Sequence, residues 1–207
     1  MLDRKVILIG YSGHGLAMVD IALENKLELL GYSDLNENEN NYFNLKFLGN
    51  EKDENFIGWK DDIVFIIGIG NNHKREQIYN YIKKKGKLIN SLISNKSNIS
   101  VTAIIGNGVF INKNVCVNAF VKIGENVILN TGCIIEHNCV ISKSVHVAPG
   151  CVLAGNVKVG ERSFIGANSV IKQGVNIGKD VIVGAGSVVI KDVLDGEKVV
   201  GNPSRSI

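Results

Sequence analysis

Two histidines, His137 and His146, stand nine positions apart in the stretch EHNCVISKSVHVAPG (136–150), which is otherwise rich in valine, isoleucine and cysteine. Imidazole can take up and release a proton near pH 7, so either ring could act as the general base of an acyl transfer. The same side chain also binds metals or packs in a core. Which use applies depends on the elements that position each ring.

The sequence around the two histidines repeats with a period of six. From Ile99 to Val189 every sixth residue is isoleucine, leucine or valine, and a second series of small residues, from Ala103 to Ser187, runs two positions earlier in each repeat. Strand alternation sends both series to the same side. The pattern therefore predicts a parallel β-helix of about five coils with three six-residue repeats each, without an inserted loop.

This register separates packing residues from candidate working residues. Cys133, Cys139 and Cys151 belong to the small inward series, so we expect them to be reduced core residues. His137 and His146 lie outside both inward series, His137 near a coil corner and His146 one corner later. Their dissimilar positions do not suggest a metal pair, and we predict no metal site.

Glycine or asparagine often follows the inward aliphatic residue directly. We interpret these residues as the turn positions that need a positive φ. Examples are Gly106, Asn112, Asn118, Gly124, Asn130, Gly160, Gly166, Gly178 and Gly184.

Residues 1–90 follow a different pattern from residues 91–207. Apolar runs at 6–9, 29–32 and 63–67 alternate with helical stretches at 16–24 and 74–85. Alternating strands and helices predict a small Rossmann-like α/β domain with a parallel sheet. We therefore predict two domains, an α/β domain over 1–90 and an all-β domain over 91–207.

Glycine-rich turns follow the first and third predicted strands of the α/β domain. These turns are GYSGHG (10–15) and GIGNN (68–72), and Asp34 ends the second strand. Parallel sheets bind ligands at this edge, main-chain N–H groups of such turns can hold phosphate, and an acidic residue there can contact a ribose. The first turn lacks G-x-G-x-x-G spacing and by itself could be a tight structural turn, but the three features together favour nucleotide binding.

Composition excludes several classes of protein. The 207-residue chain is 45% apolar with a formal net charge of +3, and the lysine run 83–85 fits a solvated helix face better than a nucleic-acid patch. The first apolar run spans four residues, too short for a signal peptide or a membrane span. We expect a cytoplasmic protein that binds neither nucleic acid nor membrane.

The whole chain resembles the bacterial nucleotide-sugar acetyltransferases of the PglD/NeuD-like group. The likeness rests on YSGHGLAMVDIA (11–22), GIGNNHKR (68–75), ILNTGCIIEHNCVISKSVHVAPG (128–150) and the G-N-P ending at 201–203. It implies a left-handed β-helix of hexapeptide repeats, acetyl-CoA as co-substrate, a nucleotide sugar as acceptor, and a homotrimer with active sites between subunits. The hand of the coil comes from this resemblance alone.

The resemblance also gives roles to residues. It makes His137 the general base and places His146 beside the thioester end of acetyl-CoA. Where family members often carry an acidic residue directly after the histidine, this chain has Asn138, so either Asn138 or Glu136 could orient the ring. The implied substrate-binding residues are Ser12, Gly13, His14, Asp34, Gly70 and Asn71, and the implied acetyl-CoA-binding residues are His146, Gly155, Ala167 and Ala185.

The expected reaction is N-acetylation of a UDP-linked 4-amino-4,6-dideoxy sugar in bacterial surface glycan biosynthesis, with GDP, dTDP or CMP as other possible nucleotides. Three alternatives stay open: a sialic acid O-acetyltransferase, a non-catalytic trimeric sugar-nucleotide-binding protein, and a nicotinamide-dependent oxidoreductase built on the first domain. The oxidoreductase would be recognised by NAD binding. The non-catalytic protein would tolerate His137→Ala.

Overall fold

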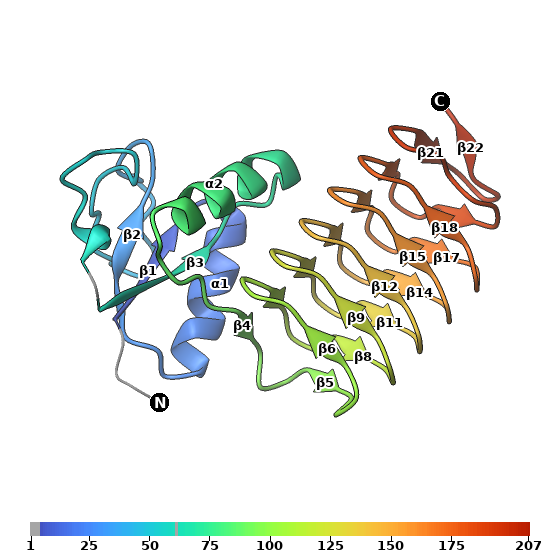
Figure 1. The fold of residues 1–207 in the computed structure, drawn as a ribbon, viewed down its shortest axis with the longest axis horizontal. Coiled ribbons are helices and arrows are strands. Elements are labelled where there is room, and N and C mark those ends of the chain that lie inside the picture. Colours follow the sequence, from blue (N-terminus) through green and yellow to red (C-terminus); the bar gives the residue numbers. More distant parts are fainter. Residues whose placement is uncertain (1–4, 61) are drawn as a thin grey trace. The chain divides into compact units, whose positions relative to one another are not determined.

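The computed structural model describes residues 5–60 and 62–207 and divides the chain into two compact units, Met1–Leu92 and Ile93–Ile207. The first unit is a three-stranded parallel sheet with two helices, and the second is a parallel β-helix (Figure 1). Both predicted fold classes are confirmed.

The sheet of the first unit has the strand order β2-β1-β3, with β1 in the centre. Apolar residues of β1 and β3 pack against Phe56, Tyr79 and Ile82 in one core, as expected for a sheet covered by helices. The first unit contains β1 (Lys5–Ile9), α1 (Gly13–Glu24), β2 (Leu29–Ser33), the short 3-10 helix η1 (Ile57–Trp59), β3 (Ile63–Ile67) and α2 (Asn72–Lys84).

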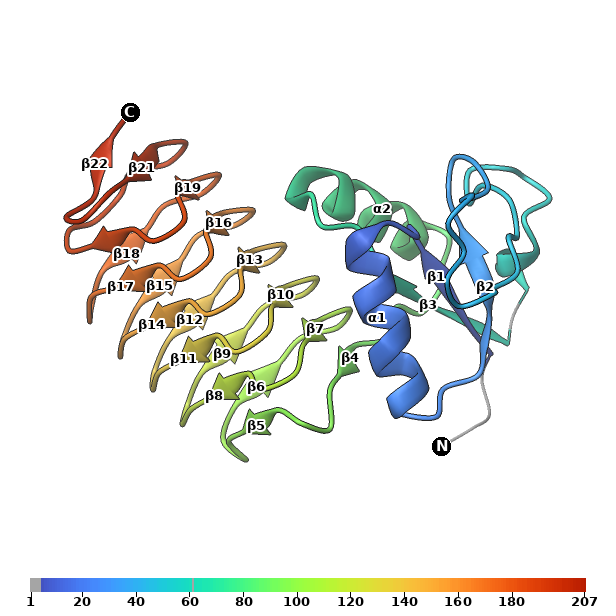
Figure 2. The same cartoon turned by 180° about the vertical axis from the view of Figure 1, so that it is seen from behind.

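The second unit winds into three faces, each built from strands of successive coils (Figure 2). Five complete coils run from β5 to β19, with partial coils at both ends. The eight-stranded face contains β4 (Leu92–Ile93), β7 (Phe110–Ile111), β10 (Ile128–Leu129), β13 (His146–Val147), β16 (Phe164–Ile165), β19 (Ile182–Val183), β21 (Lys198–Val200) and β22 (Arg205–Ser206). The six-stranded face contains β5 (Asn98–Ile99), β8 (Cys116–Val117), β11 (Ile134–Ile135), β14 (Val152–Leu153), β17 (Val170–Ile171) and β20 (Val188–Val189). The five-stranded face contains β6 (Ile104–Ile105), β9 (Lys122–Ile123), β12 (Val140–Ile141), β15 (Lys158–Val159) and β18 (Asn176–Ile177).

Both inward series fill the interior of the β-helix. Aliphatic residues from Ile111 to Val189 and small residues from Val109 to Ser187 are buried at every sixth position, while Ile99, Ala103 and Ile105 pack against this core from the first coil. Serine can occupy an inward position because its hydroxyl donates to a main-chain carbonyl, as Ser169 Oγ does to Gly184 O at 2.9 Å. This pairing removes the cost of burying an unsatisfied hydroxyl.

The prediction about positive-φ positions was wrong. The left-handed residues lie three positions after the inward aliphatic residue, at every sixth residue from Gly108 to Gly186, with φ between 55° and 77°. Glycine directly after the aliphatic residue has another cause, because it lies against the next coil. A Cβ at Gly124 would lie 2.8 Å from Lys143 N, and one at Gly160 would lie 2.5 Å from the Gly178 carbonyl carbon.

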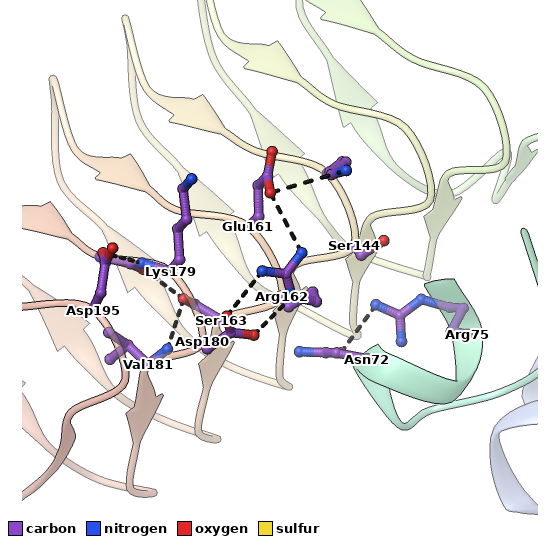
Figure 3. A network of polar contacts seen from close by, with 12 residues as sticks. Asn72, Arg75, Ser144, Glu161, Arg162, Ser163, Lys179, Asp180, Val181 and Asp195 are labelled. Carbon is purple, nitrogen blue, oxygen red and sulfur yellow. Dashed lines mark hydrogen bonds and ion pairs between the residues drawn. The ribbon is translucent and has the colours of Figure 1, made fainter. Parts of the chain in front are cut away.

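Charged residues stabilise one corner of the later coils (Figure 3). Arg162, a left-handed residue with φ 59°, donates from Nε and Nη2 to the two carboxylate oxygens of Asp180 at 2.8 and 2.9 Å. Glu161 Oε2 lies 3.4 Å from Arg162 Nη1 and 3.9 Å from Lys143 Nζ. The fork-shaped Arg162–Asp180 pair connects one coil with the next.

Candidate active site

A cavity of about 460 Å³ lies at the carboxyl edge of the sheet in the first unit. We call it the strand-edge cavity. Its wall combines the ends of β1 and β2, the turn after β3, the N-cap of α1 and the first turns of α2, at the place where parallel sheets bind ligands. The residues of this wall include Ser12, Ser33, Asp34, Glu51, Gly70 and Asn71.

The first helix presents its N-terminus to this cavity. Ser12 is its N-cap and lines the cavity, but no side chain caps the helix. The main-chain N–H groups of the first turn are therefore suited to an anionic phosphate. Gly13 and His14 form this turn without lining the cavity themselves, and a Cβ on Gly70 would lie 3.8 Å from His14 Cβ.

Asp34 and Asn71 both line the cavity, and both also hold the main chain. Asp34 Oδ2 accepts from Tyr11 N at 2.9 Å, and Oδ1 accepts from Leu35 N at 2.7 Å. Asn71 is the N-cap of α2, where its Oδ1 accepts from Lys74 N at 3.0 Å. Each predicted contact residue thus fixes the shape of a turn as well as facing the cavity.

Arg75 organises the second turn, and the sequence did not reveal this role. Its buried guanidinium donates from Nη1 to the carbonyls of Ile69 and Gly70 at 3.2 and 3.0 Å. Nη2 donates to Asn72 Oδ1 at 3.0 Å (Figure 3). Burial lowers the pKa of Arg75 to about 9, and nearby Glu76 raises it in part. The group therefore stays charged at neutral pH and shapes the turn that carries Gly70 and Asn71.

Glu51 was not among the site residues predicted from the sequence either. It lies in the irregular segment after β2, is 6% exposed, and lines the strand-edge cavity. Ser33, fully buried at the end of β2, donates from Oγ to Glu51 Oε2 at 2.7 Å. A buried acidic side chain in a cavity wall is a candidate ligand contact.

In the second unit, His137 lies at the corner between the six-stranded and five-stranded faces. Its side chain is exposed, and Nδ1 lies 3.0 Å from Oδ1 of Asn138. The amide oxygen can only accept, so Nδ1 carries the proton in this bond, and in the neutral ring the lone pair is on Nε2. Asn138 can hold this position because asparagine tolerates the required φ of 60°.

Gly155 lies beside His137, one coil further along. A Cβ at Gly155 would lie 2.6 Å from both Cε1 and Nε2 of the imidazole. Glycine therefore leaves the space that the ring occupies. Glu136 is half-buried and donates its main-chain N–H to Leu153 O. The hydrogen-bond partner of the ring is Asn138, whose Oδ1 accepts from Nδ1.

The other residues assigned to acetyl-CoA lie elsewhere on the coil. His146 is on strand β13 rather than at a corner, is 9% exposed, and packs edge-on against Phe164 at 5.1 Å between ring centroids. Its Nε2 is 3.5 Å from Asn130 Nδ2. Ala167 and Ala185 occupy matching positions of successive coils, at the corner that leads from the eight-stranded to the six-stranded face. Within one chain, the structure brings Gly155 but not His146, Ala167 or Ala185 to the His137 corner.

The inward cysteines are packing residues. Cys151 donates to Gly166 O at 2.9 Å, and Cys139 donates to Ala154 O at 3.2 Å. Burial raises the pKa of both thiols to about 11 and raises that of Cys133 further. Thiols of this kind are poor nucleophiles at neutral pH.

A second, wide-open depression of about 560 Å³ lies at the last coils. Its two carboxylates are engaged locally: Asp192 accepts from the main chain and side chain of Asn176, and Asp195 accepts from Lys179 N. The hydrogen bonds from Asn176 lower the pKa of Asp192. These contacts connect β18 and the residues after it to the segment 192–195.

Comparison with known proteins connects both units to one family. The PglD N-terminal domain model matches residues 5–82, and two hexapeptide-transferase models match residues 138–173 and 156–191. The acetyltransferase domain of PglB from Neisseria gonorrhoeae is 30% identical, with a TM-score of 0.93, over 99% of this chain and 100% of that chain. This chain belongs to the PglD-like acetyltransferases.

Two further relatives show what such proteins bind. The same Neisseria gonorrhoeae domain is known in complex with acetyl coenzyme A (28% identity, TM-score 0.90, 99% of each chain). PerB from Caulobacter crescentus is known with CoA and GDP-perosamine (27% identity, TM-score 0.90, 98% of this chain and 97% of that chain). The present PglD-like protein is accordingly an acetyltransferase of the hexapeptide type that uses acetyl-CoA.

Among residues 5–60 and 62–207, no three His, Cys, Asp or Glu side chains are grouped so that they could hold a metal ion. In the same part of the chain, no helix has the length and apolar character needed to cross a bilayer.

Proposed function

We propose that this protein transfers the acetyl group of acetyl-CoA to the amine of a nucleotide-linked 4-amino-4,6-dideoxy sugar, with UDP as the leading nucleotide, in bacterial surface glycan biosynthesis. The observation that carries the proposal is the His137 corner. There an exposed imidazole has Nδ1 hydrogen-bonded to Asn138 and its other nitrogen beside the Cα of Gly155. The strand-edge cavity supplies a place for the nucleotide.

In the proposed reaction, the neutral sugar amine attacks the thioester carbonyl carbon. A C–N bond forms and Nε2 of His137 accepts the proton that the amine loses. The C–S bond then breaks, and the thiolate of CoA takes the proton from the imidazolium. A ring whose Nδ1–H is held by Asn138 presents Nε2 for both transfers.

The proposed assembly is a homotrimer with active sites between subunits. Its support in this chain is the outward row of the six-stranded face, which is apolar over five successive strands and adjoins the His137 corner. The row consists of Cys116, Ile134, Val152, Val170 and Val188. A second copy on this face would supply the wall that the exposed imidazole lacks, and with it places for His146, Ala167 and Ala185 along acetyl-CoA.

A thiol-release assay with acetyl-CoA tests the proposal. The acceptors are UDP-, GDP- and dTDP-4-amino sugars, together with free and CMP-linked sialic acid. We expect release with a 4-amino nucleotide sugar, fastest with the UDP compound. Turnover of sialic acid alone, or silence across the panel, would overturn the proposed acceptor class.

A further inference from the structure

The strand-edge cavity contains two acidic side chains with different amounts of unused hydrogen-bonding capacity. Both carboxylate oxygens of Asp34 accept main-chain N–H groups, from Tyr11 and Leu35. Glu51 Oε2 accepts from Ser33, and no described residue donates to Glu51 Oε1. The acidic residue at the end of the second strand therefore fixes a turn, while Glu51 retains an acceptor for a ligand.

Burial makes this acceptor selective. Glu51 is 6% exposed, and its partner Ser33 is fully buried, so the side chain is fixed against the end of β2. A buried carboxylate needs hydrogen-bond donors and repels phosphate and carbonyl oxygens. The phosphates therefore belong at the N-terminus of α1, where the helix dipole and the main-chain N–H groups of the first turn favour an anion.

On the nucleoside part of such a ligand, the donors are ribose hydroxyls and base N–H groups. The N–H of a uracil lies between two carbonyl oxygens, which an adjacent carboxylate would repel. The ribose offers vicinal hydroxyls without such neighbours. In folds with this sheet edge, an acidic residue commonly binds the ribose from the end of the second strand, and here each carboxylate oxygen of that residue, Asp34, already accepts one main-chain N–H.

We propose that Glu51, held by Ser33, accepts a hydrogen bond from the ribose 2′-hydroxyl and so selects ribonucleotide over 2′-deoxyribonucleotide sugars. This inference rests on the proposed function, since it assigns the nucleotide to the strand-edge cavity. It narrows the substrate class to UDP- or GDP-type compounds and excludes dTDP-linked sugars as good acceptors.

Binding of the nucleotides alone tests the inference independently of acetyl transfer. Calorimetry with UDP, 2′-deoxy-UDP, GDP and 2′-deoxy-GDP gives two ratios, ribo over deoxy and uracil over guanine. For the unchanged protein we expect a ribo-over-deoxy preference of about tenfold to a hundredfold, because loss of the hydroxyl leaves Glu51 without its donor. Glu51→Ala should reduce that ratio to about twofold or less and leave the base ratio unchanged.

Two variants keep the test valid if Glu51→Ala folds poorly. Glu51→Gln retains size and an acceptor oxygen and should weaken the preference only in part. Ser33→Ala removes the hydroxyl that holds Glu51 and should lower the ribo-over-deoxy ratio without removing the carboxylate. Lys52→Ala is the matched control, because Lys52 adjoins Glu51 and lines the same cavity but is exposed, and the ratio should not change.

The outcomes separate this inference from the proposed function. Acetylation of a UDP-4-amino sugar without ribo-over-deoxy preference would overturn the role of Glu51 and leave the proposed function standing. If Glu51→Ala abolishes a ribo-over-deoxy preference but the protein acetylates no amino sugar, the role of Glu51 would stand and the proposed function would be overturned. If Glu51→Ala changes the uracil-over-guanine ratio instead, the residue reads the base and the ribose assignment is wrong.

Discussion

The strand-edge cavity and the His137 corner differ in how much of their surroundings one chain provides. The cavity is walled by the ends of β1 and β2, the turn after β3, residues at both helix starts and the segment around Glu51. At the corner, the described contacts of the exposed imidazole are with Asn138 and Gly155. One unit therefore encloses the cavity by itself, whereas one chain leaves the imidazole at the corner open. Variants of the cavity should change KM, and variants of the corner should change kcat.

The largest effect should come from His137→Ala. Removal of a general base should lower kcat by about 10²- to 10⁴-fold, while UDP binding to the other unit stays unchanged. Steady-state kinetics and calorimetry measure the two quantities. Gln173→Ala is the control, because Gln173 is exposed at the same corner position two coils later. A parallel loss of UDP affinity would contradict the division of labour between the two regions.

Gly155→Ala should have the next largest effect. The new methyl group would lie 2.6 Å from Nε2, so the imidazole has to move, and we expect kcat to fall by about tenfold to a hundredfold. Gly186→Ala is the control, since nothing lies within 4 Å of its added Cβ. Its φ of 68° should reduce stability without changing the ring. Equal kcat values for the two variants would show that Gly155 does not set the position of His137.

Arg75→Lys tests the opposite region. Lysine cannot reach the carbonyls of Ile69 and Gly70 with the same fork of donors. The turn that carries Gly70 and Asn71 should loosen, so KM for the nucleotide sugar should rise about threefold to tenfold with kcat unchanged. Arg205→Lys, an exposed substitution in β22, is the control. A lower kcat with normal KM would place Arg75 with the reaction instead.

The smallest change should come from Asn138→Asp. A carboxylate beside Nδ1 stabilises the imidazolium, so His137 would lose its proton only at higher pH, and the acid limb of the kcat profile should move upward by about one pH unit. Below that limb the variant should be slower. Asn156→Asp, the equivalent substitution one coil later with φ 62°, should leave the profile unchanged. An unchanged limb in Asn138→Asp would mean that Asn138 does not orient the ring.

The regular part of the molecule was predictable and the irregular part was not. A six-residue period repeated from Ile99 to Val189 determines which side chains point inward, because each coil repeats the same geometry. The repeat alone did not distinguish the two reasons for glycine after the aliphatic residue, since a left-handed turn and close contact with the next coil both favour a missing Cβ. The structure shows that contact with the next coil is the cause.

The candidate sites follow the same division. Ser12, Asp34, Gly70 and Asn71 could be assigned to one sheet edge because strand ends and turns are visible in sequence. Glu51 could not, because the segment after β2 has no repeat or helical period and its contact with Ser33 spans 18 residues. The burial of Arg75 could not be predicted either, since nothing in the sequence of a charged helix marks one charged residue as buried.

Asn138 answers to two requirements at once. Its backbone adopts a φ of 60°, and its side chain oxygen lies 3.0 Å from the imidazole. Glycine, asparagine and aspartate accept that backbone readily, but glycine has no oxygen for the ring. Asparagine and aspartate meet both requirements, and they differ by one charge. The substitution Asn138→Asp could therefore shift the pH range in which the enzyme is active without changing the fold.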